Sequence, residues 1–278
     1  MRADPICAAG EDQTLDGAAG RHDIRNRPVV GSAMSAHYDT IGVNYADLRK
    51  SDARIEAAIS EALGAAETVL NVGAGTGSYE PSGRKVTALE PSAEMIGQRS
   101  PSAAPAIQGH AEDLPFDDKS FDASMAVLTI HHWSDQPKGL SELRRVTRGP
   151  VVLLTFDPDH RGFWLLDYIP ELAALDDTQM PKLKEYERWL GPVEISTVPV
   201  PHDCSDGFMA AYWRRPSAYL DARIRAAISP FWALGDISKQ LSKLSQDLED
   251  GTWARRYADV LALEEYDAGY RLVVHGGS

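Results

Sequence analysis

Short apolar runs and stretches of helical periodicity alternate along the chain. Residues 51–63 and 136–147 carry apolar side chains at the three- and four-residue spacing of a helix with one buried face. Apolar runs bounded by Gly, Pro and charged residues predict strands at 68–72, 85–90, 105–108, 122–128, 150–156, 193–199 and 270–274. Because helices and strands alternate, we expect right-handed crossovers and a largely parallel sheet of the α/β class.

A glycine-rich turn separates the first two predicted strands. It contains Gly73, Gly75 and Gly77, and the second strand ends on Glu90. Glycines let the backbone approach a ligand and adopt positive φ angles, although a purely structural turn would need them too. A strand, such a turn and a second strand ending in a carboxylate together form the local geometry of a nucleoside site. The spacing is not that of dinucleotide sites and no Gly-Lys-Ser/Thr follows, so we expect a nucleoside without a pyrophosphate.

Two further strand ends carry polar side chains. Residues 109–116 include acids that could meet an adenine edge, and His131, His132 and Trp133 follow the fourth predicted strand. Ligands of open α/β sheets bind at the carboxyl ends of the strands. The sequence therefore gathers one candidate ligand site at this edge of the sheet.

On these motifs the chain resembles the class I methyltransferases that depend on S-adenosylmethionine, of the bacterial small-molecule (type 11-like) kind. The resemblance extends over residues 38–156 and is weaker beyond them. It implies a Rossmann-like, mostly parallel seven-stranded sheet whose last strand, 270–274, is an antiparallel edge. It also implies S-adenosyl-L-methionine as cofactor, bound by Tyr38, Tyr45, Arg49, Asn71, Gly73, Gly75, Gly77, Glu90, Pro91, Met95, Ala111, Glu112 and Leu128.

The resemblance also implies separate roles for these residues. The glycine turn passes under the methionine and ribose, Glu90 holds the ribose, and Ala111 with Glu112 flanks the adenine. Leu128 and His131 face the transferred methyl group. The N-terminal lid, with Tyr38, Tyr45 and Arg49, closes over the methionine carboxylate.

Two departures from the family pattern change this picture. Asn71 stands where the family usually carries an acid, so hydrogen-bonding capacity is kept and a charge is lost. The segment between Gly77 and Val86 is short and contains Pro81 and Gly83, so we expect a turn instead of the family's full helix. That turn would leave the cofactor site more open on one side.

Two inserts, residues 157–190 and 200–265, contain five of the chain's six tryptophans. Their aromatic rings either pack together in a small helical cap or wall a pocket for an apolar or planar substrate, where rings can also stabilise a cation. The predicted substrate-binding residues are Trp164, Tyr168, Trp189, Phe208, Tyr212 and Trp213. A helical stripe of Leu241, Leu244 and Leu248 favours packing or a subunit contact.

Methyl transfer needs mainly an acceptor atom held about 3 Å from the methyl carbon. A base is needed only if the acceptor keeps its proton, and the candidates are His131, His132, Asp157, His160 and Glu171. Because neighbouring residues of a strand point to opposite faces, at most one of the His131 and His132 side chains should reach the substrate. The spacing of the histidines and acids matches no familiar metal site, so no metal is expected.

Composition narrows the partners. A formal net charge of −13 argues against nucleic acid as partner. The sequence contains no apolar run long enough for a membrane span, and no secretory signal pattern in residues 1–33. Cys7 and Cys204 imply no disulfide framework, so a cytoplasmic protein is expected. Residues 1–33 are poor in large apolar side chains and predict a disordered arm, which with the cap helices could build a homo-oligomer.

The predicted organisation has three parts. An arm (1–33) precedes a lid and cofactor-binding core (34–156), and residues 157–278 complete the sheet and carry the cap. The leading hypothesis is methyl transfer to oxygen, nitrogen or carbon of a small apolar or aromatic metabolite, as in secondary metabolism. Two alternatives stay open: a non-methylating cyclisation or elimination, and a regulatory protein that senses the cofactor.

Overall fold

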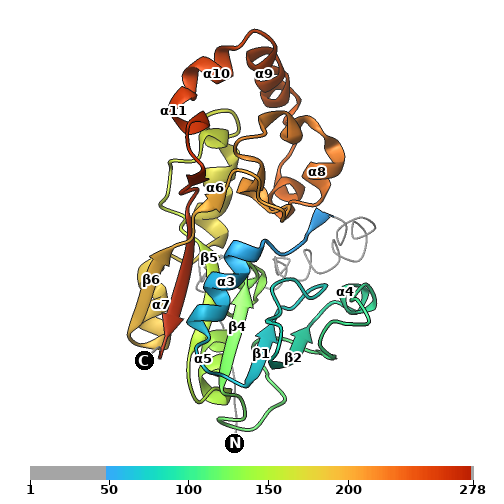
Figure 1. Ribbon diagram of the computed structural model, residues 1–278, viewed down its shortest axis with the longest axis vertical. Helices are drawn as coiled ribbons and strands as arrows, with labels where there is room; N and C mark the ends of the chain where they lie inside the picture. The colour runs from blue at the N-terminus through green and yellow to red at the C-terminus, as the bar shows by residue number, and fades with distance from the viewer. Residues whose placement is uncertain (1–47, 277–278) are drawn as a thin grey trace, which may run out of the picture.

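Seven strands form one sheet within residues 48–276, the part of the chain that the computed structural model describes (Figure 1). In spatial order they are β3 (Ala106–Gln108), β2 (Lys85–Glu90), β1 (Thr68–Val72), β4 (Ala123–Val127), β5 (Val151–Phe156), β9 (Tyr270–His275) and β6 (Val193–Thr197). Neighbouring strands are parallel, except that β9 is antiparallel to both β5 and β6. The predicted class, the mostly parallel sheet and the antiparallel last strand are confirmed.

The predicted position of the last strand is wrong. β9 lies between β5 and β6 and is not an edge. Its run Leu272-Val273 is buried, as an interior strand requires, whereas most of β6 is exposed and includes Glu194 and Ser196. Polar side chains suit an edge strand because they oppose pairing with another chain.

Helices cover both faces of the sheet. On one face α3 (Ala53–Ala62) buries Ile55 and Ile59 against the sheet, and on the other α5 (Gln136–Val146) buries Leu140 and Leu143 (Figure 1). These two helices confirm the predictions made from periodicity. The N-caps explain where they begin, because the side chains of Asp52 and Asp135 accept hydrogen bonds from backbone amides of the first turn.

Part of the first predicted insert belongs to the sheet and not to a cap. Helix α7 (Leu183–Leu190) buries Tyr186 and Leu190 in the same cluster as α5. The Tyr186 hydroxyl shares a hydrogen bond of 2.7 Å with the Thr155 hydroxyl of β5. α7 is therefore a second helix of this face, placed just before β6.

The remaining insert residues form a cap above the sheet, at the top of Figure 1. Its elements are η3 (Trp164–Asp167), α6 (Glu171–Gln179), β7 (Val200–Pro201), η4 (Met209–Tyr212), η5 (Pro216–Leu220), α8 (Ala222–Ala226), η6 (Ser229–Ala233), α9 (Ser238–Glu249), α10 (Thr252–Arg256), α11 (Ala258–Leu261) and β8 (Glu265–Tyr266). β7 and β8 pair in a small sheet that the sequence pattern did not predict. The leucine stripe of α9 packs on the core, with Leu244 fully buried.

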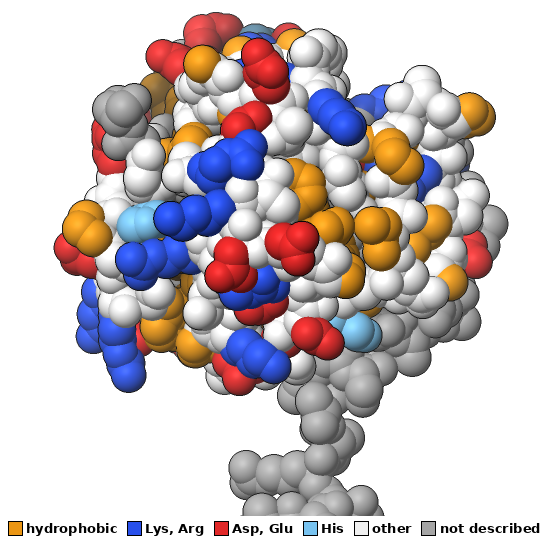
Figure 2. All heavy atoms as spheres, turned by 90° about the horizontal axis from the view of Figure 1, so that it is seen from below, with side chains coloured by type: hydrophobic (Ala, Val, Ile, Leu, Met, Phe, Trp, Pro, Cys, Tyr) orange, Lys and Arg blue, Asp and Glu red, His pale blue; other side chains and the backbone are white. Residues whose placement is uncertain are grey.

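Charged side chains of both signs form ion pairs around the C-terminal end of α5. Arg145 pairs with Asp118 and Glu142, and Arg148 with Asp122. On the face seen from below, acidic and basic side chains are interspersed (Figure 2).

Within the described residues no helix has the length and apolar character that a membrane crossing demands. The predicted arm and the lid residues Tyr38 and Tyr45 lie outside the described part of the chain.

Candidate active site

The glycine turn between β1 and β2 has the conformation that its sequence requires. Gly73, Gly75 and Gly77 have φ angles of 71°, 51° and 100°, which side chains other than glycine rarely tolerate. The amides of Gly73 and Ala74 both donate to the Leu89 carbonyl, at 2.8 and 3.1 Å. No helix forms between Gly77 and the start of β2, so the predicted turn is confirmed. A Cβ on Gly73 would lie only 2.1 Å from Oγ1 of Thr129, which fixes the turn against the end of β4.

A cavity of about 420 Å³ opens at this edge of the sheet and is called here the first cavity. Most of the predicted cofactor-binding residues line it, namely Arg49, Asn71, Gly73, Gly75, Glu90, Pro91, Met95, Ala111, Glu112 and Leu128. Gly77 does not line it, because it faces Ala103 and Glu80 within the turn. The carboxyl ends of β1, β2 and β4 thus build one site, as expected for an open α/β sheet.

Glu90 is the main buried acid of the first cavity. Its side chain accepts hydrogen bonds from the amides of Gly75 (2.8 Å) and Ser92 (3.0 Å), and the residue is 7 % exposed. Burial raises the pKa of this carboxyl, although the two amides partly oppose the shift. Each oxygen keeps a lone pair beyond these bonds, so hydroxyl groups of a bound ribose could replace the lost hydration.

Ala111 and Glu112 also line the first cavity. Glu112 accepts hydrogen bonds from the Ser134 hydroxyl (2.8 Å) and the Asp135 amide (3.0 Å) through one oxygen. Burial acts to raise the pKa of Glu112, but these hydrogen bonds outweigh it and the net shift is downward. An ionised carboxylate is a hydrogen-bond acceptor and suits the amino edge of an adenine.

A buried ion pair that sequence reasoning missed braces the glycine turn. Arg99 and Glu80 approach to 2.5 Å, and Arg99 also donates to the Gly75 carbonyl at 2.9 Å. The Asn71 amide donates to the same Glu80 carboxylate at 3.4 Å. Asn71 therefore uses its hydrogen-bonding capacity toward a neighbouring acid, and the charge that position 71 lacks is present on Glu80.

A second missed residue, Asp206, connects the cap with Arg49 and with Tyr79, which follows the glycine turn. One carboxylate oxygen of Asp206 lies 2.7 Å from Nε of Arg49 and the other accepts a hydrogen bond from the Tyr79 hydroxyl at 2.9 Å. Asp206 is 1 % exposed. Burial and the Asp206 charge raise the pKa of Tyr79, which stays a hydrogen-bond donor. Nothing local marks Asp206, because Arg49 lies 157 positions away.

Asp206→Asn should lower the free energy of unfolding by about 1.5–2 kcal/mol, because a hydrogen bond to a charged group is lost and Arg49 keeps no full counter-charge. Urea denaturation measures the change. The matched control is Asp203→Asn, since Asp203 pairs with Arg54 from an exposed position and such pairs contribute about 0–1 kcal/mol. Equal losses in the two variants would contradict a stabilising role for the Asp206 network.

A smaller cavity of about 80 Å³, called here the second cavity, adjoins the first. Both cavities are lined by Arg49 and Leu128. The second is walled by Phe156, Phe163, Phe208 and Tyr270, together with aliphatic side chains and a few polar groups of the cap. The first cavity, which has the size of a nucleoside, and the apolar second cavity thus meet at Arg49 and Leu128.

His131 and His132 face different cavities. His131 lines the second cavity and His132 the first. They belong to a 3-10 helix, η2 (Ile130–His132), so the predicted strand geometry is wrong, and their ring centres lie 3.9 Å apart. Burial first and the Arg49 charge second lower the pKa of His131 to about 4, and the pKa of His132 is also lowered. Both imidazoles are therefore neutral at physiological pH.

These lowered pKa values predict acid sensitivity. The unfolded chain takes up a proton at each histidine near pH 6.5, whereas folded His131 does so only near pH 4, so this part of the stability is lost as the pH falls through that window. His131→Gln should flatten the fall in unfolding free energy between pH 7 and pH 4.5, measured by urea denaturation. An unchanged slope in His131→Gln would refute the assignment.

Three predicted catalytic residues line neither cavity. Asp157 accepts a hydrogen bond from the Asp159 amide at 3.0 Å, and Glu171 accepts one from Gln240 at 2.6 Å. His160 lies against Gly162. The carboxylates of Asp157 and Glu171 thus have partners outside the cavities, and none of the three residues lines the point where the cavities meet.

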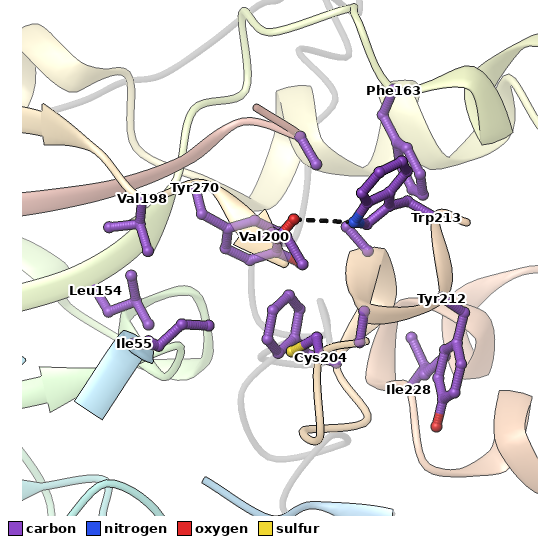
Figure 3. Packing of buried hydrophobic residues seen from close by; sticks show 14 of the residues in the cluster. Ile55, Leu154, Phe163, Val198, Val200, Cys204, Tyr212, Trp213, Ile228 and Tyr270 are labelled. Atoms are coloured by element: carbon purple, nitrogen blue, oxygen red, sulfur yellow. Dashed lines mark hydrogen bonds between the residues drawn. The ribbon is translucent and has the colours of Figure 1, made fainter. Parts of the chain in front are cut away.

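Among the predicted substrate-binding residues, Phe208 alone lines the second cavity. The indole of Trp213 donates to the Val200 carbonyl at 2.9 Å, as the dashed line in Figure 3 shows, and the indole of Trp164 donates to the Trp213 carbonyl at 2.8 Å. Tyr212 is 9 % exposed and packs edge-on against Tyr219. The polar ends of both indoles are thus consumed by the packing of the cap.

The two remaining aromatic residues also pack. The Tyr168 hydroxyl donates to Asp247 at 2.9 Å, and Trp189 stacks edge-on against Tyr186 under the opposite face of the sheet. Within residues 48–276 no three His, Cys, Asp or Glu side chains cluster in a way that could hold a metal ion.

Known proteins resemble this chain both in its cofactor-binding half and over most of its length. A family profile described as "Methyltransferase domain" matches residues 70–154. The crystal structure of a putative methyltransferase from an antibiotic biosynthesis pathway of Anabaena variabilis is 38% identical, with a TM-score of 0.77. The match covers 82% of this chain and 98% of that chain.

Curated relatives match over a shorter range. The chloroplastic 2-methyl-6-phytyl-1,4-hydroquinone methyltransferase 2 of Oryza sativa subsp. japonica is 31% identical over 44% of this chain and 36% of its own length. A demethylmenaquinone methyltransferase of Mycobacterium sp. (strain KMS) is 31% identical over 43% of this chain and 58% of its own length. The chain thus spans between about a third and three fifths of these relatives. The sheet order, the glycine turn and the match to the Anabaena structure agree with one another. They show that the chain belongs to the class I S-adenosylmethionine-dependent methyltransferases.

Proposed function

We propose that this chain transfers a methyl group from S-adenosylmethionine to an oxygen, nitrogen or carbon atom of a small apolar or aromatic metabolite. The observation that carries the proposal is the meeting of the two cavities at Arg49 and Leu128. The first has the size and the acids for a nucleoside, and the second has the apolar walls of a small-molecule site.

The residues of the first cavity fit the cofactor. Glu90 offers oxygens to the ribose, Ala111 and Glu112 line the adenine end, and Arg49 can meet the methionine carboxylate. When bound there, S-adenosylmethionine supplies an electrophilic methyl group. The glycine turn contributes by keeping its backbone close to the ligand, which no other residue type allows at Gly73.

The residues of the second cavity would position the acceptor and exclude water. The rings of Phe156, Phe208 and Tyr270 form an apolar wall, so the main contribution to catalysis is a fixed approach of the acceptor. Because its pKa is lowered to about 4, His131 is a neutral imidazole and could accept a proton from an acceptor that still carries one. Nδ1 of His131 has no hydrogen-bond partner within residues 48–276.

The names of the relatives support a small-molecule acceptor. The similar structure from Anabaena variabilis is described as part of an antibiotic biosynthesis pathway, and two curated relatives methylate quinone or hydroquinone compounds by name. A role in secondary metabolism, with an acceptor that has a large apolar part, agrees with these names and with the cavity walls.

The test begins with calorimetric titration of the full chain with S-adenosylmethionine, S-adenosylhomocysteine and, as control, NAD. Micromolar binding of the first two alone is expected. Incubation with a panel of phenols, amines and hydroquinones should then yield S-adenosylhomocysteine. Cofactor binding with no such product from any acceptor would overturn methyl transfer, and turnover without cofactor consumption would favour a cyclisation or elimination instead.

A further inference from the structure

A buried carboxylate faces the second cavity. Helix α6 (Glu171–Gln179) buries two side chains, Leu172 and Asp176, which lie four positions apart and therefore on one face. Asp176 is 8 % exposed and lines the second cavity. Its neighbour Asp177 faces solvent, where it pairs with Arg161 at 2.8 Å and Lys182 at 3.3 Å.

Asp176 differs from the other deeply buried acids around the site. Asp206 and Glu80 each have an arginine partner, whereas the Asp176 carboxylate has neither a hydrogen-bond nor an ion-pair partner within residues 48–276. Burying an unpaired carboxylate opposes folding, because the charged form loses its hydration. Burial accordingly raises the pKa of Asp176 from 3.8 to about 7. The Arg161 charge opposes this shift, and the Asp177 charge adds to it. Packing alone does not explain an acid at this position.

The surroundings of Asp176 favour a positive charge. Arg49, which also lines the second cavity, is already paired with Asp206, so the cavity has a net negative balance when Asp176 is ionised. Tyr270 lines the same cavity as Asp176. Burial raises the pKa of its hydroxyl, and the Asp176 charge adds a smaller upward contribution. The faces of aromatic rings such as those of Tyr270 and Phe208 attract cations.

We infer that Asp176 binds a basic nitrogen of the methyl acceptor, and that the acceptor is a small amine with an apolar or aromatic body. The inference rests on the proposed function, because it assigns the second cavity to the acceptor. The carboxylate of Asp176 receives the N–H donors and the charge of the amine, and Phe156, Phe208 and Tyr270 contact its apolar body. Asp176 is a binding residue in this scheme and selects amines over isosteric alcohols and acids.

The first experiment compares three probes of one shape, benzylamine, benzyl alcohol and benzoate, titrated into the protein saturated with S-adenosylhomocysteine. Benzylamine should bind at least tenfold more tightly than the other two at pH 8, and Asp176→Asn should remove this preference. The control Asp177→Asn lies on the same helix outside the cavity and should keep it. Equal binding of the three probes, or no binding, would overturn the inference.

A second measurement separates a ligand-binding acid from a structural one. The raised pKa of Asp176 means that its contribution to stability is present below pH 3.8 and is lost as the pH rises through about 7. Asp176→Asn should therefore raise the melting temperature, and more at pH 8 than at pH 5, whereas removing a structural acid would lower it. The charged or titratable groups that face or neighbour Asp176 are Arg161, Asp177, Tyr270, His131 and Arg49.

The same variants distinguish a failure of the Asp176 role from a failure of the proposed methyl transfer. Affinity for S-adenosylhomocysteine should be unchanged in Asp176→Asn, since Asp176 does not line the first cavity. Wild-type protein that binds the cofactor but shows no amine preference would overturn the role of Asp176 and leave methyl transfer standing. Wild-type protein that fails to bind S-adenosylhomocysteine in the initial titration would overturn the proposed function itself.

Discussion

Glu90→Ala is expected to weaken S-adenosylmethionine binding roughly 30- to 800-fold, or about 2–4 kcal/mol. Two hydrogen bonds from ribose hydroxyls to a charged group would be lost together. The structure adds a further reason, because Glu90 also accepts a hydrogen bond from the Gly75 amide and so holds the glycine turn in place. Isothermal titration calorimetry of the purified variant measures the effect.

The controls for Glu90 separate charge from position. Glu90→Gln keeps an acceptor for the ribose but loses the charge, so its affinity should lie between those of wild type and Glu90→Ala. Glu94→Ala removes an exposed acid of α4 (Ala93–Gly97) that interacts with Gln98 and does not line the first cavity, and it should bind the cofactor as wild type does. Unchanged binding in Glu90→Ala would mean that the end of β2 does not hold the ribose.

The strands and the glycine turn could be predicted because their signals are local. β1 and β2 begin and end at the predicted residues, since an apolar run bounded by glycine or charge records both burial and termination. The turn is equally local, because a positive φ angle favours glycine whatever lies around it. The place of the first cavity could be predicted for the same reason, because the ends of neighbouring parallel strands form it.

The order of the last two strands and the buried ion pairs could not be predicted in the same way. Residues 270–274 contain no signal for the strands beside which they lie. The exposed, partly polar side chains of β6 explain why β6, and not β9, forms the edge of the sheet. Asp206 pairs with Arg49, which lies 157 positions away in the sequence. A single sequence contains no signal that predicts a contact between residues so far apart. One signal was available at Asp176, because an acid four positions after Leu172 interrupts the apolar face of its helix.

Residue type alone could not separate the walls of the second cavity from the core of the cap. Trp164 and Trp213 have the composition of a binding site, yet hydrogen bonds to backbone carbonyls fix both in the packed interior. Phe156 and Tyr270, at two adjacent strand ends of the sheet, line the cavity instead. Which ring faces the cavity depends on the path of the cap, and that path is set by contacts distant in sequence.

Gly73→Ala is expected to lower the free energy of unfolding by about 2–5 kcal/mol. Gly73 has a φ of 71°, where an L-residue is strained by about 1–2 kcal/mol. The new Cβ would also lie 2.1 Å from Oγ1 and 2.8 Å from Cβ of Thr129, and forcing a methyl group into such a space costs about 1–3 kcal/mol. The contact joins the ends of β1 and β4, so the first cavity should lose cofactor affinity together with stability.

Gly83→Ala is the matched control, because Gly83 has a similar φ of 75° but its Cβ would meet no atom within 4 Å. Gly83→Ala should lower the free energy of unfolding only by the conformational strain, about 1–2 kcal/mol. Adding Thr129→Ala to Gly73→Ala should restore little of the lost unfolding free energy, because the Cβ that remains at position 129 is itself too close. Adding Thr129→Gly to Gly73→Ala should restore more of it, because that Cβ is then removed. Urea denaturation of the four variants measures the series. Equal losses at positions 73 and 83 would show that Thr129 does not constrain the turn, and that the turn is held by backbone conformation alone.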